Sequence, residues 1–206
     1  VKNAVGEAKS AEQKARKIYN LIRDQFTCTD YDQLFVQESL KKVADNKAGG
    51  VAEINLLLTA MLRNAGLDAE PVILSTRENG FVYENYPILS RFNYVVCSFK
   101  ADGKEWLLDA TRPGMGFGRL DYDCYNGQAR VVNETATPVK LRPDMITEKK
   151  ESFFQMFSSK DSIVTQVRRL YGYYESREAR KKIKLEGDES FLKQIRAQYN
   201  NDVSIG

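Results

Sequence analysis

The chain has 206 residues, of which 42% are hydrophobic and 29% are charged, and this is enough for one sizeable core with or without a smaller appendage. Its 31 Lys and Arg residues nearly balance its 28 Asp and Glu residues, for a net charge of +3, which is too mild to indicate nucleic-acid binding. No apolar run approaches the roughly 20 residues needed to span a bilayer, and with no histidine in the sequence no imidazole can act as a general base or a metal ligand.

Helical patterns fill the first part of the chain. Ser10 and Gln13 form a capping-box pattern ahead of apolar residues at helical spacing, which predicts a helix over residues 11–26. A turn over residues 28–31 and a short helix over residues 37–44 are expected next.

The most apolar segment follows a break over residues 45–50, which contains Asn and two glycines. Residues 51–65 are apolar nearly all round, which predicts a buried central helix. Gly66 stands where a left-handed C-terminal cap belongs.

Strand patterns then replace the helical ones. Strands are predicted over residues 71–76, 92–99 and 105–111, and the last two are joined by a hairpin turn at residues 101–104. An extended loop over residues 81–90 separates the first two strands. Gly114, Gly116 and Gly118 form a flexible loop, which is not a dinucleotide fingerprint because no apolar helix follows it.

The last third of the chain starts anew after a soft boundary near Arg142. Residues 1–142 are expected to form the core, and residues 143–206 an accessory C-terminal extension of the same or a following domain. Within this extension we expect strands over residues 151–157 and 162–170 and helices over residues 175–184 and 189–199. A turn is expected at residues 158–160.

Three cysteines, at positions 28, 97 and 124, lack the CxxC spacing of a zinc site or a disulfide framework. One bridge with one free thiol stays open. Cys97 lies in a predicted strand and is interpreted as a buried structural thiol. Cys28 and Cys124 lie in predicted loops, where a thiol could be reachable, but neither has an imidazole partner.

Four separated blocks of the sequence resemble the bacterial transglutaminase-like family, which has the papain-like thiol-enzyme fold. They cover about residues 11–127 in the family's order: Gly49-Gly50-Val51-Ala52-Glu53-Ile54-Asn55-Leu56-Leu57-Leu58, Leu62-Arg63-Asn64-Ala65-Gly66-Leu67-Asp68-Ala69-Glu70-Pro71-Val72, Phe92-Asn93-Tyr94-Val95-Val96 and Trp106-Leu107-Leu108-Asp109-Ala110-Thr111. The resemblance implies an α+β fold, with N-terminal helices and a buried central helix packed on an antiparallel β-sheet.

In such enzymes a Cys at the start of the buried helix is the nucleophile, a His on a strand is the base, and an Asp orients the His. Here the Cys position falls on Val51 and the His position on Tyr94, while Asp109 matches the third member. Valine has no nucleophilic atom, and a Tyr phenol with an unperturbed pKa near 10 is a poor base. The resemblance therefore predicts a degenerate triad and no catalytic residue.

Three neighbouring polar residues have structural explanations. Glu53 lies in the first helical turn, where an acid suits the helix dipole. Asn55 on a buried helix is expected to satisfy a loop backbone group. Arg112 is expected to pair with Asp109, which would give the retained Asp a structural task.

The first functional hypothesis is a catalytically inactive binding or scaffolding module within a larger exported bacterial protein. A peptide, a protein or a glycan would occupy the former active-site groove, whose expected walls are Gly50, Val51, Tyr94, Trp106 and Asp109. By resemblance alone the location would be periplasmic or otherwise extracytoplasmic. No cofactor and no metal is expected.

The second hypothesis is purely architectural, with the domain holding flanking domains of a longer chain in register. Tyr83, Tyr86 and the glycine loop 114–118 would then make interdomain contacts, and a closed groove with an apolar patch elsewhere would favour this hypothesis. An alternative from a different class is residual acyl-transferase, amidase or peptidase-like activity that uses a non-standard nucleophile.

Overall fold

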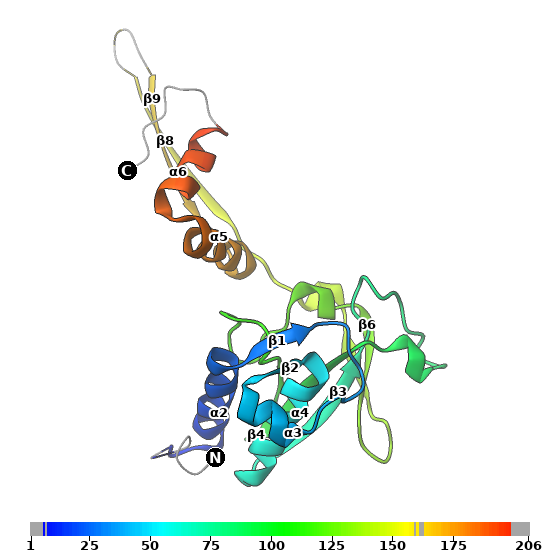
Figure 1. Cartoon of the computed structure of the whole chain (residues 1–206). Helices are drawn as coiled ribbons and strands as arrows, with labels where there is room; N and C mark the ends of the chain where they lie inside the picture. The colour runs from blue at the N-terminus through cyan, green and yellow to red at the C-terminus, as the bar shows by residue number, and fades with distance from the viewer. Residues whose placement is uncertain (1–5, 7, 159, 161–162, 199–206) are drawn as a thin grey trace. The chain divides into compact units, whose positions relative to one another are not determined.

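A computed structural model of the chain describes residue 6, residues 8–158, residue 160 and residues 163–198. The chain divides into two compact units, Val1–Ile146 and Thr147–Gly206 (Figure 1). Among the described residues, all those that are buried lie in the first unit.

The start of one helix and the end of another are capped as the sequence predicts. Helix α2 (Ala11–Gln25) begins at Ser10, whose hydroxyl accepts a hydrogen bond from the Gln13 backbone N–H. Helix α4 (Val51–Asn64) ends in a Schellman motif: Gly66 adopts a left-handed φ of 74°. The backbone N–H groups of Gly66 and Leu67 bond the carbonyls of Arg63 and Leu62.

The start of α4 is shaped by a strand pair that the sequence did not indicate. Residues 28–31, predicted as a turn, lie mostly in strand β1 (Thr27–Asp30), which pairs in parallel with β2 (Ala48–Gly50). The short helix α3 (Leu40–Asn46) ends at Lys47, whose φ is 53°. β2 then leads directly into α4, so this pair fixes where the central helix begins.

The sheet of the first unit is antiparallel and has the strand order β5-β4-β3-β6-β7. β3 (Asp68–Leu74), β4 (Tyr94–Ala101) and β5 (Lys104–Leu108) confirm the three predicted strands, although β5 ends before Asp109. The turn between β4 and β5 places Asp102 and Gly103 at φ of 50° and 72°, the positive values that a tight hairpin turn needs. The remaining strands, β6 (Gly127–Val131) and β7 (Pro138–Leu141), were not predicted.

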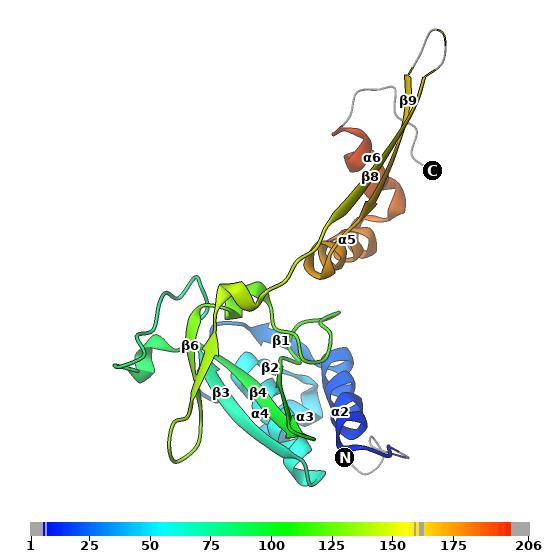
Figure 2. The same cartoon turned by 180° about the vertical axis from the view of Figure 1, so that it is seen from behind.

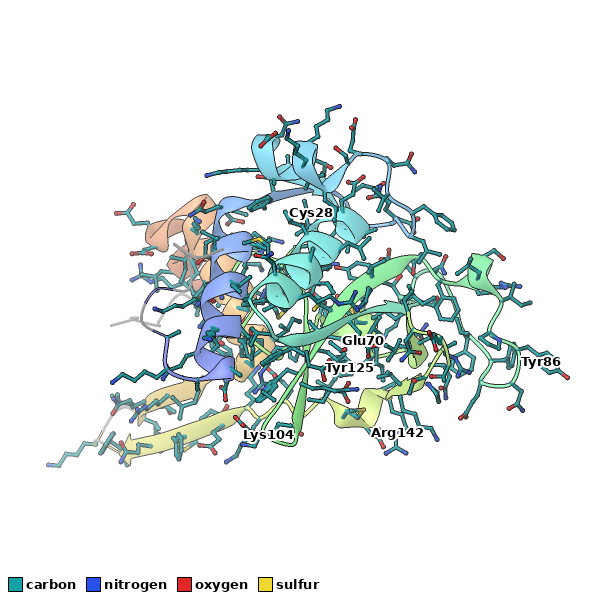
Figure 3. All side chains as sticks on the ribbon, turned by 90° about the horizontal axis from the view of Figure 1, so that it is seen from below. Cys28, Glu70, Tyr86, Lys104, Tyr125 and Arg142 are labelled. Atoms are coloured by element: carbon teal, nitrogen blue, oxygen red, sulfur yellow. The ribbon has the colours of Figure 1, made fainter. Side chains whose placement is uncertain are left out.

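Short 3₁₀ turns fill the connections of this unit. They are η1 (Leu89–Arg91), η2 (Tyr122–Cys124) and η3 (Pro143–Met145). The loop before η1 reaches out to Tyr86, at the edge of the unit (Figure 3), and the Tyr86 side chain is exposed.

Each face of the sheet carries its own buried cluster. α2, α3 and α4 lie on one side of the sheet (Figures 1 and 2) and enclose the first cluster, which includes Cys97 and Phe99 of β4. The second cluster includes Tyr94 and Val96 of the same strand. Val51, the first residue of α4, joins the second cluster, so the start of the central helix contributes to the core on the other face of the sheet.

The second unit pairs β8 (Glu151–Ser158) with β9 (Ile163–Leu170) in an antiparallel hairpin and continues with α5 (Tyr173–Glu186) and α6 (Asp188–Arg196). These elements confirm the four predicted in this part. The predicted start of the second strand at Ser162, the predicted end of the last helix at Tyr199 and part of the expected turn at 158–160 lie outside the described residues. None of the described residues from 147 to 198 is buried.

Candidate functional site

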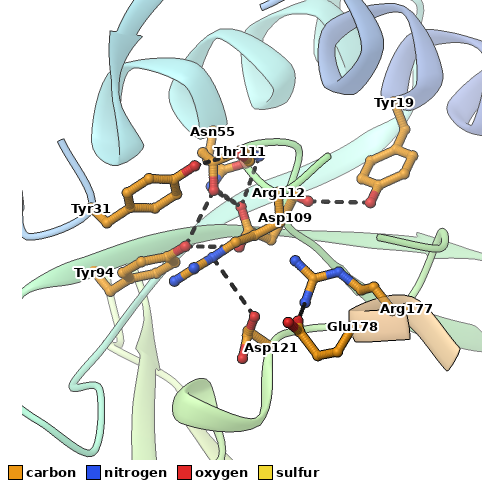
Figure 4. A network of polar contacts seen from close by, with 10 residues as sticks. All are labelled: Tyr19, Tyr31, Asn55, Tyr94, Asp109, Thr111, Arg112, Asp121, Arg177 and Glu178. Atoms are coloured by element: carbon orange, nitrogen blue, oxygen red, sulfur yellow. Dashed lines mark hydrogen bonds and ion pairs between the residues drawn. The ribbon is translucent and has the colours of Figure 1, made fainter. Parts of the chain in front are cut away.

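Tyr94 and Asp109 meet in the first unit, at the start of β4 and just after β5. The Tyr94 hydroxyl donates a hydrogen bond of 2.8 Å to Asp109 Oδ2 (Figure 4). Val51 lies in the same buried cluster as the Tyr94 ring. All three residues are fully buried, with 0% of their surface exposed, so the fold brings together the residues that the sequence singled out and closes them off from solvent.

The second carboxylate oxygen of Asp109 is equally well satisfied. Asp109 Oδ1 accepts hydrogen bonds from Asn55 Nδ2 at 3.0 Å, from the Thr111 backbone N–H at 3.0 Å and from the Thr111 hydroxyl at 2.6 Å (Figure 4). A buried carboxylate is tolerated when donors surround it in this way. Through this network Asp109 connects α4, β4 and the segment after β5.

Asn55 has the structural task that its buried helical position predicts, and more. Its Nδ2 also donates to the Val95 carbonyl at 2.8 Å, and its Oδ1 accepts from the Ala110 backbone N–H at 3.0 Å. One side chain therefore satisfies a strand carbonyl and a loop N–H that would otherwise be buried without a partner.

The Tyr94 hydroxyl is a donor and not a base in this setting. Burial, together with the negative charge of Asp109, raises the pKa of Tyr94 well above its usual 10. The phenol therefore stays protonated at neutral pH. It also lies 3.2 Å from the Thr111 hydroxyl.

Arg112 does not make the ion pair with Asp109 that the sequence suggested. Its Nε lies 3.9 Å from Asp121 Oδ2, and its guanidinium stacks over the Tyr31 ring at 4.4 Å from the ring centroid. The Tyr31 hydroxyl donates to the Thr111 carbonyl at 3.2 Å. Asp109 has its own hydrogen-bond donors, and Arg112 pairs instead with Asp121, which lies further along the same connection between β5 and η2.

The start of α4 is covered by the loop that precedes α3. A Cβ added at Gly50 would overlap the Gln33 carboxamide, so the Gln33 side chain lies directly on the backbone at the helix start. Glu53 Oε1 accepts hydrogen bonds from the backbone N–H groups of Gln37 and Glu38 at 2.7 and 2.8 Å, and Glu53 Oε2 accepts one from the Gly50 N–H at 2.6 Å.

Glu53 is therefore more than a helix-dipole partner. Burial disfavours its charged form, but the hydrogen bonds from Gly50, Glu38 and Gln37 outweigh burial and lower its pKa below the ordinary value. The ionised carboxylate holds the 33–38 loop against the helix.

The residues expected to line the former active-site groove are buried or belong to different clusters in the structure. Gly50, Val51, Tyr94 and Asp109 are buried. Trp106 packs against the first cluster, stacked on Phe99 with ring centroids 5.3 Å apart, whereas Val51 and Tyr94 belong to the second.

A pocket of about 450 Å³ lies nearby, and its lining shares no residue with the predicted set. Its lining is mostly polar and acidic: Asp30, Tyr31, Asp32, Thr76, Glu78, Asn79, Asn93, Arg112 and Asp123. The sequence analysis named Arg112 but did not group it with the others, because these residues come from three connections, β1–α3, β3–β4 and β5–β6, that only the tertiary fold brings together.

The three cysteines are free thiols. Cys97 is buried in the cluster opposite Tyr94, as its strand position predicts. Cys124 is buried too and not reachable, contrary to its predicted loop position, because η2 packs it into the second cluster. Cys28 lies half-buried beside α4 (Figure 3), and burial raises the pKa of its thiol to about 12.

The described part of the chain contains no group of three or more His, Cys, Asp or Glu side chains that could hold a metal ion. Nor does it contain a helix both long and apolar enough to cross a membrane.

Two solved structures are similar to this chain. Among solved structures, a "putative protease" from Parabacteroides distasonis matches with a TM-score of 0.50 and 16% identity over 68% of this chain and 26% of that one. A "putative cysteine protease" from Cytophaga hutchinsonii matches with a TM-score of 0.40 and 14% identity over 83% of this chain and 50% of that one. This chain thus spans about a quarter of the first protein and half of the second. No curated protein matches the sequence.

The family is established by sequence. The model of the transglutaminase-like superfamily matches residues 1–108, just over half of the chain. This range contains α2, α4, β3, β4 and β5, and with them Asn55 and Tyr94; it ends one residue before Asp109. The chain belongs to the transglutaminase-like superfamily.

Proposed function

We propose that this chain is a non-catalytic transglutaminase-like domain that serves as a structural module of a longer, extracytoplasmic bacterial protein. In this proposal Val51 and Tyr94 stand where the family's Cys and His would stand, and Asp109 is the retained third member. The observation that carries the proposal is the 2.8 Å hydrogen bond from Tyr94 to Asp109, in a buried network beside Val51.

The chemistry of the network supports the proposal. A thiol enzyme needs a thiolate and a proton acceptor within reach of each other. The chain has no histidine, and Tyr94 is a protonated donor to Asp109. The pKa values of Cys28 and Cys97 are raised to about 12 by burial, and that of Cys124 is raised as well, so thiolate is scarce at neutral pH.

The covered helix start supports a structural role over ligand binding at the same place. Gln33 lies on Gly50, and Glu53 holds the covering loop in position through backbone hydrogen bonds. Apolar side chains are instead exposed elsewhere, at Phe81 and Tyr86 for example. This combination of a closed groove and an outlying apolar surface is what an architectural module would have.

Activity assays on the chain test the proposal. We expect no peptide hydrolysis and no transfer of an amine to a glutamine-containing peptide above the rate of the blank. A thiol-directed electrophile is expected to modify the folded chain slowly and all three cysteines only after denaturation. The Cys28→Ser variant is the matched control, because Cys28 is the least buried of the three thiols.

Turnover by the wild-type chain that disappears in Cys28→Ser would reject the proposal and establish the alternative, an acyl-transferase or peptidase with a non-standard nucleophile. Turnover that survives in Cys28→Ser but disappears after electrophile treatment would reject it equally, with the nucleophile at one of the other two thiols.

A further inference from the structure

The hairpin of the second unit exposes an unusual amount of apolar surface. Side chains of both strands are exposed, among them those of Phe153, Phe154, Met156, Phe157, Ile163, Val164, Val167 and Leu170. Since none of the described residues from 147 to 198 is buried, this unit has no core of its own. A two-stranded hairpin whose apolar side chains stay exposed is marginally stable in water. A partner that buries this surface would therefore stabilise the unit.

The strand register separates these side chains into two faces. Phe154 pairs with Val167, and Met156 pairs with Thr165. Ser158 pairs with Ile163 on the same face, because directly paired residues and every second residue share a face. We call this the Phe154 face, and its members are Ser152, Phe154, Met156, Ser158, Ile163, Thr165, Val167 and Arg169.

The opposite face is less continuous. It pairs Phe153 with Arg168 and Gln155 with Gln166, so polar side chains interrupt its apolar ones. The Phe154 face instead has three adjoining rows that each hold an apolar side chain and no charge, and Ser152 with Arg169 closes it at one end. An apolar centre with a polar border is the usual anatomy of a protein interface.

We infer that the Phe154 face docks on the Phe154 face of a second copy of this chain, so that two hairpins form a four-stranded sandwich. Each central row combines a large side chain on β8 with a smaller one on β9: Phe154 beside Val167, and Met156 beside Thr165. In this dimer the two hairpins lie face to face and are related by a two-fold axis that runs between them, parallel to the strands. β8 of each copy then lies over β9 of the other. Large side chains then face small ones, as interdigitating packing requires.

The exposed area is of the size that such a dimer needs. The exposed fractions of the apolar members are 58% for Phe154, 72% for Met156, 72% for Ile163 and 39% for Val167. With about 150–200 Å² per side chain these four expose roughly 400 Å² in each copy. Two copies together reach about 800 Å², and the bordering residues supply the rest of the approximately 1,000 Å² that marks a specific interface.

The test is the oligomeric state of the 206-residue chain, measured by sedimentation velocity over a wide concentration range. We expect a monomer–dimer equilibrium. Phe154→Glu is expected to raise the dissociation constant of the dimer at least tenfold, because it places a charge in the centre of the interface. The matched control is Phe153→Glu, which changes the neighbouring residue on the opposite face, where Phe153 is 52% exposed, and is expected to leave the dissociation constant within about twofold.

Three outcomes overturn the inference. A chain that stays monomeric at every concentration has no such interface, and growth beyond the dimer means unspecific association. An equal effect of Phe154→Glu and Phe153→Glu means that the Phe154 face is not the one that docks. Far-ultraviolet circular dichroism of the whole chain, to which β8, β9, α5 and α6 contribute, checks that both variants are folded, and the result does not depend on whether the chain is catalytic.

Discussion

At the scale of single residues, Asp109 joins the β4–β5 hairpin to α4, which is distant along the chain. Tyr94 brings a hydroxyl from the start of β4, and Asn55 brings an amide from α4 to the same carboxylate. The Tyr94 hydroxyl satisfies Asp109 Oδ2, which burial would otherwise leave without a partner, and such a loss costs more than an average hydrogen bond contributes. The pair therefore stabilises the fold whatever its role in function.

Tyr94→Phe tests the weight of this pair. The substitution keeps the ring and removes the donor to buried Asp109 Oδ2, so we expect a loss of about 1–3 kcal/mol in the free energy of unfolding. Urea titration followed by Trp106 fluorescence measures this loss. Tyr83→Phe is the control, because the Tyr83 side chain is 70% exposed, and an equal stability of the two variants would contradict the structural role of the Tyr94 hydroxyl.

At the scale of elements, the central helix depends on the loop that covers its start. Glu53 in the first turn of α4 accepts hydrogen bonds from the backbone of Gln37 and Glu38 as well as from Gly50. The loop has no regular structure to satisfy these N–H groups. The Glu53 carboxylate on α4 therefore positions the 33–38 loop, which lies across the start of the helix.

The contribution of Glu53 can be measured as the difference in the free energy of unfolding between wild type and Glu53→Gln, followed as a function of pH. The folded-state pKa of Glu53 is lowered from 4.5, so its stabilisation is present above that pH and is lost as the pH falls through the folded-state pKa. We expect the variant to be less stable by about 1–3 kcal/mol near pH 7. The difference should shrink as the pH falls below 4.5.

Urea titrations of both proteins across this pH range provide the measurement. Glu105→Gln serves as the control, since Glu105 lies on the surface with its nearest cation, Lys100, 3.7 Å away. A difference between wild type and Glu53→Gln that does not change with pH would rule out ionisation of Glu53 as the cause.

At the scale of the whole molecule, the two units differ in how they are stabilised. The first has two buried clusters, one on each face of its sheet. The second has a hairpin and two helices with no buried residue among those described. Local stability follows buried contacts, so the two units should open with different free energies.

Hydrogen exchange of the chain, diluted until it is monomeric, measures this difference. We expect the slowest amides in α4 and β4 and exchange at least a hundredfold faster in β8 and β9, because only the first pair lies within buried clusters. Equal protection of β4 and β8 would show that the second unit has a stabilising partner that its own residues do not supply.

Local patterns predicted much of the first unit. Ser10 and Gly66 marked helix ends through their capping chemistry, and the Asp102-Gly103 turn marked the hairpin. The blocks shared with the transglutaminase-like family predicted the fold class, which the match over residues 1–108 confirms. β6 and β7 were missed because they have only five and four residues, too few for their alternation of apolar and polar residues to stand out.

The candidate site was predictable only in part. The sequence singled out Val51, Tyr94 and Asp109, and the fold does gather them. The partner of Arg112 and the covering of Gly50 by Gln33 could not be read from the sequence, because both depend on loops whose paths no periodicity describes.

The sequence by itself determined which chemistry this protein lacks: a chain without histidine has no imidazole, whatever its fold. It also determined the helices and most of the strands, since capping and periodicity are local properties of the chain. Only the tertiary structure decided that the start of α4 is covered and that the donors to Asp109 lie inside the protein. It also decided that an acidic pocket is present, with Arg112 in its lining. Those features arise where segments remote in sequence come into contact, and burial and hydrogen bonding there depend on every segment at once.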